Sequence, residues 1–272
     1  MKLGLCTWSY NRTFASGKMD LEKLLHVCAE DLKIGGADLI DVHFKYGGDA
    51  DKLLKDMDYL LKIKKLATDL EITISAVSPG NSFGKDKESD EKAEVDKINK
   101  WTDIAYILGS PNLRIFAGWA PKEKHKELWP KVVKSIKSCA EYAQKKGVTL
   151  AIESHNGGGY LPTSIETHKL LKDVNSPWVK LNLDTGNYHD PDMYDALKRS
   201  MPYATHMHCK IHKLSKDEDE LEFDFDKIFT ILKEANYRGF FNVEYEGKEE
   251  ELEYVPKSFQ MIKRFMKKYE LF

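Results

Sequence analysis

Short apolar runs alternate with longer, charged stretches along the whole chain. Apolar residues in the charged stretches recur at helical spacing, as Leu21, Leu24 and Leu25 do. The runs have the length and composition of buried strands. They lie at 3–9, 37–44, 72–78, 112–118, 148–154, 178–184, 204–210 and 239–245. The pattern therefore predicts eight consecutive strand–helix units.

The order of these units predicts the architecture. Helices are expected near 20–34, 51–70, 88–108, 164–173, 191–200, 225–236 and 250–268. A further helix is expected after the fourth strand, ending near 145–147. Strands separated by such helices favour parallel pairing through right-handed crossovers. We therefore expect an α/β fold, a single (β/α)₈ TIM barrel over 1–272, with no linker between its halves. The alternative, an open doubly wound sheet, would normally carry a Gly-rich phosphate turn after its first strand, where CTWSYNRTF has no glycine.

Composition limits the possible binding partners of the protein but adds little about its fold. Hydrophobic residues make up 42% of the chain, charged residues 32%, and the formal net charge is −2. Lysines are interspersed with Asp and Glu, so the sequence predicts no nucleic-acid partner. No apolar run approaches the roughly 18 residues of a membrane span. The four cysteines form no CxxC pair and the N-terminus has no secretory pattern, which favours a cytoplasmic enzyme. The predicted surface helices carry no clear apolar stripe that would indicate an oligomeric interface.

Polar residues close the last four predicted strands. Glu153, Asp184 and Glu244 end apolar runs, and His208 lies near the end of the seventh. The carboxyl ends of barrel strands line one mouth, so these side chains should converge. Each acid alone has a simpler explanation as a helix cap. Three crowded carboxylates and one histidine instead predict one divalent ion, Mn²⁺, Mg²⁺, Co²⁺ or Zn²⁺, without choosing among them.

The seventh strand carries two histidines on one face. His206 and His208 point to the same side because strand side chains alternate with a period of two. His208 is nearer the mouth and is the predicted ligand. His206 is then either a residue of a deeper layer or a hydrogen-bond partner of a ligand.

Several motifs carry a resemblance to a known family. The segments IESHNGG, LNLDTGN, HMHCK and NVEYEG are similar, in this order and spacing, to the xylose-isomerase-like sugar phosphate isomerase/epimerase superfamily. LRIFAG and SPGNSF resemble its signatures for the fourth and third strands. The resemblance implies metal ligation by Glu153, Asp184, His208 and Glu244. The sequence departs from the pattern of this superfamily at Asn187, where many sugar epimerases carry a histidine.

The metal set and the two glutamates together predict a reaction class. A metal can polarise a substrate carbonyl and acidify the neighbouring C–H. Glu153 and Glu244 would then remove and return a proton through an enediolate, giving a sugar or sugar phosphate isomerase or epimerase. Loss of a β-oxygen group after the same abstraction would give a dehydratase or lyase on a keto-polyol or keto-sugar. A non-catalytic carbohydrate-binding relative is a third hypothesis, disfavoured by the paired glutamates.

Three charged or titratable residues are candidates for binding the small sugar-like substrate. His155 shares a face with Glu153 and either polarises a substrate oxygen or binds water as a loop residue. Lys210 either stabilises developing negative charge or forms a salt bridge. Arg114 either grips a carboxylate or phosphate or forms an internal ion pair.

Two amides and two aromatic residues complete the candidate substrate site. Asn81 and Asn187 could bind hydroxyl groups, although Asn is also favoured by turn geometry. Trp8 and Trp119 could form an apolar wall, although aromatic residues near strand ends are more often packing residues.

Overall fold

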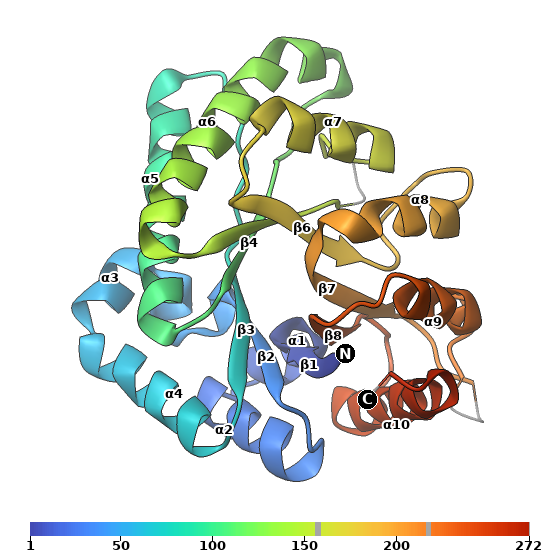
Figure 1. The fold of residues 1–272 in the computed structure, drawn as a ribbon. Coiled ribbons are helices and arrows are strands. Elements are labelled where there is room, and N and C mark those ends of the chain that lie inside the picture. Colours follow the sequence, from blue (N-terminus) through green and yellow to red (C-terminus); the bar gives the residue numbers. More distant parts are fainter. Residues whose placement is uncertain (156–158, 216–218, 272) are drawn as a thin grey trace.

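Eight parallel strands hydrogen-bond in chain order, and β8 pairs with β1 to close the sheet into a barrel. The computed structural model describes residues 1–155, 159–215 and 219–271. The strands are β1 Lys2–Cys6, β2 Gly36–Ile40, β3 Thr73–Ser78, β4 Asn112–Phe116, β5 Thr149–Glu153, β6 Val179–Asp184, β7 Ala204–Ile211 and β8 Phe240–Tyr245. Helices surround these strands on the outside of the barrel (Figure 1). The predicted (β/α)₈ barrel is confirmed.

The helices follow the amphipathic stretches. They are α1 Asn11–Ala15, α2 Leu21–His26, α3 Ala50–Lys55, α4 Met57–Asp69, α5 Glu88–Leu108, α6 His125–Lys146, α7 Ser164–Val174, α8 Met193–Ser200, α9 Phe225–Glu234 and α10 Glu251–Tyr269. Several begin at a side chain that accepts a free backbone N–H of the first turn. These capping residues are Asp20, Asp49, Asp56, Thr163, Asp192 and Asp224.

The structure corrects three of the predicted boundaries. The first strand stops at Cys6 and the second at Ile40, and each is followed by a 3-10 turn. The Thr7 hydroxyl accepts the Ile40 N–H at 2.9 Å, so a side chain completes the end of β2. The helix predicted over 51–70 is two helices, because Asp56 leaves the helical conformation and caps α4.

A layer of hydrogen-bonded polar side chains fills the barrel beneath the carboxyl ends of its strands. His206 Nδ1 lies 2.8 Å from Asn182 Oδ1, and Asn242 Nδ2 lies 2.8 Å from His206 Nε2. The Ser75 hydroxyl donates to Asn242 Oδ1 at 3.0 Å. All four residues are buried. Apart from Asn182 Nδ2, which makes no hydrogen bond among the described residues, this floor layer pairs these side-chain groups with one another beneath the cluster.

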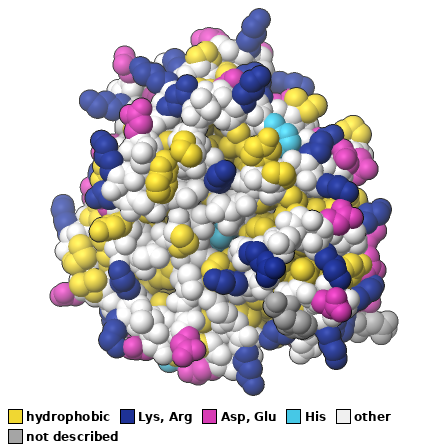
Figure 2. Space-filling model, in the orientation of Figure 1, with side chains coloured by type: hydrophobic (Ala, Val, Ile, Leu, Met, Phe, Trp, Pro, Cys, Tyr) yellow, Lys and Arg dark blue, Asp and Glu magenta, His cyan; other side chains and the backbone are white. Residues whose placement is uncertain are grey.

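The surface is mixed in charge where Figure 2 displays it. Lys and Arg side chains are scattered among Asp, Glu and apolar side chains on that face and form no single basic cluster there. Among the described residues, no helix is long and apolar enough to cross a membrane. All four cysteines are buried free thiols.

Candidate metal centre

The last four strands bring four buried side chains together at the carboxyl end of the barrel. Glu153, Asp184, His208 and Glu244 each place one ligand-type atom within 4.8 Å of the others. His208 Nδ1 lies 3.3 Å from Glu153 Oε1 and 3.5 Å from Glu244 Oε1. Their strands are consecutive neighbours in the barrel. Side chains 91 residues apart in the chain therefore share one centre.

Two buried atoms of this cluster lack the partners that buried polar atoms normally have. Among the described residues, His208 Nδ1 and Asp184 Oδ2 make no hydrogen bond. Asp184 Oδ2 does lie 3.2 Å from Lys210 Nζ, but at an angle that forms no hydrogen bond. An imidazole nitrogen and a carboxylate oxygen without hydrogen bonds, close to two further carboxylates, are a donor set that fits a divalent cation.

Each glutamate of the cluster uses its two oxygens differently. Glu153 Oε2 lies 3.3 Å from Arg114 Nε, and Glu244 Oε2 accepts from Lys210 Nζ at 2.5 Å. The Oε1 atom of each glutamate faces His208 instead. Both glutamates therefore have one oxygen anchored by a cation and one oxygen at the centre.

At the centre, burial and neighbouring positive charges shift the pKa values of the acidic side chains in opposite directions. Burial would raise the pKa of Glu153, but His208 and Arg114 hold it below its usual value. Burial likewise opposes ionisation of Glu244, but Lys210 and His208 hold its pKa well below the usual value. Burial raises the pKa of Asp184 to about 7, and the attraction of Lys210 does not offset it. The two glutamates are therefore ionised at neutral pH, whereas Asp184 is only partly ionised.

The other nitrogen of His208 has a carboxylate partner that the sequence reasoning missed. His208 Nε2 lies 2.6 Å from Asp38 Oδ2, and the Ser78 hydroxyl donates to Asp38 Oδ1 at 2.5 Å. Burial would raise the pKa of Asp38, but the hydrogen bond and charge of His208 hold it below the usual value. The available signal was an acidic residue inside the otherwise apolar run ADLI.

Cys6 lies close to both Asp38 and the same histidine. Its Sγ donates to Glu244 Oε1 at 3.4 Å, and Cys6, Asp38 and His208 also lie close enough together to be a second candidate metal group. Burial and the Glu244 charge raise the pKa of the Cys6 thiol well above its usual value. A protonated thiol is a poor metal ligand. The four-residue cluster is therefore the better donor set.

A cavity of about 240 Å³ opens over the cluster. Six of the predicted site residues line it, namely Trp8, Arg114, Glu153, His155, Lys210 and Glu244. Asp41 and Glu246, which the sequence did not single out, also reach it. Glu246 Oε1 lies 3.1 Å from Lys210 Nζ, so that ammonium group contacts three carboxylates. Asp184 and His208 lie beneath, fully buried.

Three predicted substrate-binding residues do not line this cavity. The Asn81 amide accepts from Phe116 N and donates to Phe116 O, both at 2.8 Å, and so joins the β3 loop to the end of β4. Asn187 Nδ2 donates to Glu153 Oε1 at 3.3 Å and to Ser154 O at 3.1 Å. Trp119 packs edge-on against His155, with ring centroids 5.5 Å apart. These contacts hold the walls of the site.

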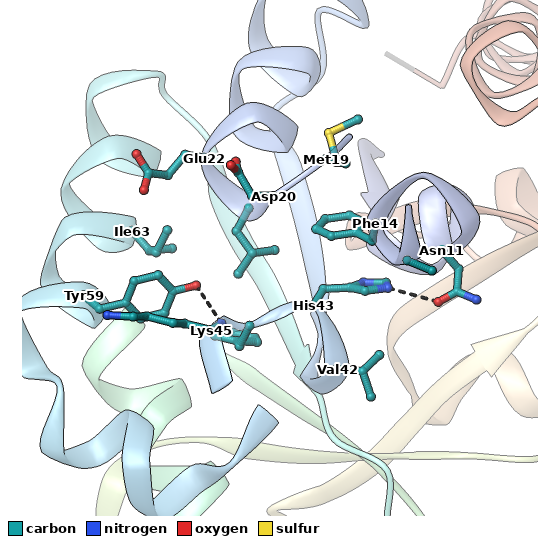
Figure 3. Close-up of a pocket in the computed structure, with 13 residues that line it drawn as sticks. Asn11, Phe14, Met19, Asp20, Glu22, Val42, His43, Lys45, Tyr59 and Ile63 are labelled. Atoms are coloured by element: carbon teal, nitrogen blue, oxygen red, sulfur yellow. Dashed lines mark hydrogen bonds between the residues drawn. The ribbon is translucent and has the colours of Figure 1, made fainter. Parts of the chain in front are cut away.

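A second cavity, of about 470 Å³, lies beside the first and shares Val42 with it. Figure 3 shows His43 inside it, with the imidazole turned to Asn11 and flanked by Phe14. The Phe14 and His43 rings stack with centroids 4.0 Å apart, and His43 Nδ1 lies 2.9 Å from the Thr7 hydroxyl. Burial lowers the pKa of His43 to about 4. His43 is thus a neutral packing residue outside the first cavity.

Comparisons with known proteins agree with the fold. Inosose dehydratase of Bacillus thuringiensis (strain Al Hakam) is 31% identical over 143 residues, which are 44% of this chain and 48% of that protein. The chain thus spans about half the length of the curated relatives it matches. The structure of L-ribulose 3-epimerase has a TM-score of 0.76 at 16% identity, covering 99% of this chain and 95% of the other. The structure of the IOLI protein with a binding zinc atom has a TM-score of 0.75 at 17% identity, covering 99% and 98%.

The family model of the xylose isomerase-like TIM barrel matches residues 30–265, which include the seven strands from β2 to β8. The similar proteins named above include a dehydratase and an epimerase, which are enzymes. The resemblance inferred from the strand-end motifs is confirmed. The chain belongs to the xylose isomerase-like TIM-barrel family.

Proposed function

We propose that the protein is a divalent-metal-dependent isomerase or epimerase of a sugar or sugar-like substrate. The observation that carries this proposal is the arrangement of Glu153 and Glu244, each with one oxygen held by a cation and the other at the centre. Glu153, Asp184, His208 and Glu244 would hold the ion. When bound, the ion would polarise a substrate carbonyl and make the neighbouring C–H more acidic.

The two glutamates can carry the proton transfer. Both are ionised at neutral pH, so either can remove the proton beside the carbonyl. The enediolate of the substrate would then take the proton back, from the same glutamate or from the one across the site. Arg114 and Lys210 keep the carboxylates in place during this exchange, because each binds the oxygen that points away from the centre.

The cavity lining suits a small polyhydroxy compound. Asp41 and Glu246 present carboxylate acceptors for hydroxyl groups, and Trp8, which is 37% exposed, presents an apolar surface. Arg114 also lines the cavity, with its Nε held 3.3 Å from Glu153 Oε2. A cavity of about 240 Å³ has room for a single sugar ring or a short open chain.

A dehydratase is the second candidate, and the sequence relatives favour it. Inosose dehydratase is 31% identical to this chain over 143 residues. A dehydratase would need the same proton abstraction, followed by loss of a hydroxyl group as water from the next carbon. The same glutamates would serve both reactions, so the products distinguish them.

Proton exchange with solvent tests the proposal directly. The chelator-treated protein is reloaded with Mn²⁺, Mg²⁺, Co²⁺ or Zn²⁺ in turn and incubated in D₂O with free ketoses, sugar phosphates and keto-polyols. An isomerase or epimerase incorporates deuterium and forms an isomer of equal composition. A dehydratase gives a product that has lost one water. Absence of exchange in every combination would favour a carbohydrate-binding relative and reject the proposed enzyme.

Substitutions of the two glutamates test the assigned roles. Glu153→Gln and Glu244→Gln should each lower turnover by about 10²-fold or more, because each removes a general base. Glu91→Gln is the control, because Glu91 is a buried acid on α5 that accepts from Ser135 and Lys85, outside the site. Full turnover in either site variant would contradict the two-glutamate mechanism.

A further inference from the structure

The two nitrogens of His208 have different surroundings. Nδ1 faces Glu153 and Glu244 and, among the described residues, makes no hydrogen bond. Nε2 lies 2.6 Å from Asp38 Oδ2, which reaches it from β2, 170 residues away in the chain. A neutral imidazole carries its proton on only one nitrogen, and the hydrogen bond made by one nitrogen decides which of the two keeps its lone pair.

Asp38 is itself firmly held. It is fully buried, and the Ser78 hydroxyl donates to its Oδ1 at 2.5 Å. Ile40 and Ser78 are register partners of β2 and β3, so the hydroxyl comes from the strand directly beside Asp38. Both carboxylate oxygens therefore have a partner, and Oδ2 is left with the single role of accepting from His208.

We propose that Asp38 is a positioning residue that fixes the tautomer and ring orientation of His208, so that the Nδ1 lone pair faces the metal ion. The carboxylate accepts the Nε2–H, so Nδ1 is the nitrogen that would be without a proton when the metal ion is bound. This inference rests on the proposed metal centre and adds a residue that does not belong to its ligand set.

Asp38 has a second conceivable role, as a ligand together with Cys6 and His208. That group would use atoms that already have partners, because Asp38 binds Ser78 and His208 while the Cys6 thiol donates to Glu244. The unpartnered atoms lie on the other side of the imidazole, at Nδ1 and at Asp184 Oδ2. The geometry therefore favours the positioning role.

Metal affinity and the spectrum of the bound ion test this role independently of turnover. Co²⁺ affinity is measured by competition with a chelator, and the visible spectrum of the Co²⁺ protein reports its ligands. Asp38→Asn keeps the shape of the side chain but can donate to Nε2 and so drive the proton to Nδ1. It should weaken binding by about 10–100-fold and change the spectrum. Ser78→Ala, which only loosens Asp38, should weaken binding less.

Glu91→Gln is the matched control, since it also replaces a buried acid that accepts from a serine hydroxyl. It should keep the wild-type affinity and spectrum even where it lowers the unfolding temperature. If Asp38→Asn and Ser78→Ala both bind Co²⁺ as the wild type does, the positioning role is wrong while the metal centre stands. If the wild type binds none of the four divalent ions, the metal centre and the positioning role are both wrong.

Discussion

Arg114 and Lys210 illustrate how one side chain can serve two roles that look alike in a sequence. A cation near a strand end either grips a substrate anion or pairs with an internal carboxylate. Lys210 contacts Asp184, Glu244 and Glu246, and Arg114 lies against Glu153 and stacks 4.0 Å over the Phe116 ring. Both cations therefore have internal carboxylate partners, and both also line the cavity.

His43 permits a prediction about acid stability. Its ordinary pKa of 6.5 falls to about 4 in the folded protein because of burial, so folding favours the neutral imidazole. The stabilising contribution is complete above pH 6.5 and is lost as the pH falls through 4. At 1.36 kcal/mol for each pKa unit, the loss between pH 7 and pH 4.5 is about 2 kcal/mol. Urea unfolding at the two pH values measures it.

The control for this prediction is His43→Gln, which removes the titrating group and retains a polar side chain. The variant should be less stable than the wild type at pH 7, because the stacking on Phe14 is weakened. Between pH 7 and pH 4.5 it should lose about 2 kcal/mol less than the wild type does. Equal losses in the two proteins would show that His43 does not resist protonation.

At the scale of elements, three neighbouring strands repeat one arrangement. β6, β7 and β8 each place a buried polar residue in the floor layer and a residue of the candidate metal centre two positions later. The pairs are Asn182 and Asp184, His206 and His208, and Asn242 and Glu244. A period of two keeps both members of a pair on the inner face of the barrel, with the second nearer the mouth. This regularity explains why strand position alone selected His208 over His206.

The close contact between β1 and the floor layer gives a second prediction. A Cβ added to Gly4 would lie 2.0 Å from Asn242 Oδ1, which Ser75 and His206 help to hold in place. Gly4→Ala should therefore lower the free energy of unfolding by about 1–3 kcal/mol, as overpacking of a full interior does. Urea unfolding of the variant measures the loss.

Gly35→Ala is the matched control, because a Cβ there meets no atom within 4 Å. It should leave the free energy of unfolding within about 0.5 kcal/mol of the wild type, as surface substitutions usually do. If the two variants are equally stable, the floor layer has room to adjust and the tight contact has no energetic consequence.

The elements also show which parts of the site could be predicted from the sequence. Strand order and alternation located Glu153, Asp184, His208 and Glu244, because those signals are local. Asp38 was missed because its partner lies 170 residues away, and only closure of the barrel brings them together. The turns after β1 and β2 were taken for strand because their composition resembles that of the strands. Their shape depends on the hydroxyl of Thr7, which bonds to Ile40 across two elements.

At the scale of the whole molecule, barrel closure concentrates negative charge at one end. Among the described residues around the centre, carboxylates outnumber permanent cations. The carboxylates belong to Asp38, Glu153, Asp184, Glu244 and Glu246, and the cations to Arg114 and Lys210. The formal charge of the chain is only −2, so this excess is local. A divalent ion would offset most of it in a buried place where uncompensated charge is costly.

Metal binding should therefore stabilise the folded barrel. An ion present at 100 times its dissociation constant adds about 2.7 kcal/mol to the free energy of unfolding. Thermal unfolding of the chelator-treated protein, with and without Mn²⁺ or Zn²⁺, measures the gain. Asp184→Asn removes a buried carboxylate whose Oδ2 lacks a hydrogen-bond partner within the described residues. That variant should unfold at a higher temperature than the wild type without metal, and its temperature should rise less when metal is added.

The unfolding temperature without metal and its rise on adding metal separate the effect of charge from the effect of metal coordination. Relief of crowding alone would raise the unfolding temperature of metal-free Asp184→Asn, whereas loss of a ligand alone would reduce its response to metal. Glu91 lies on α5, outside the barrel mouth, so Glu91→Gln should keep the full rise in unfolding temperature when metal is added. A variant at Asp184 that responds to metal as strongly as the wild type would remove this residue from the ligand set. A wild-type protein that shows no response to any divalent ion would mean that Lys210, Arg114 and protonation alone balance the buried carboxylates.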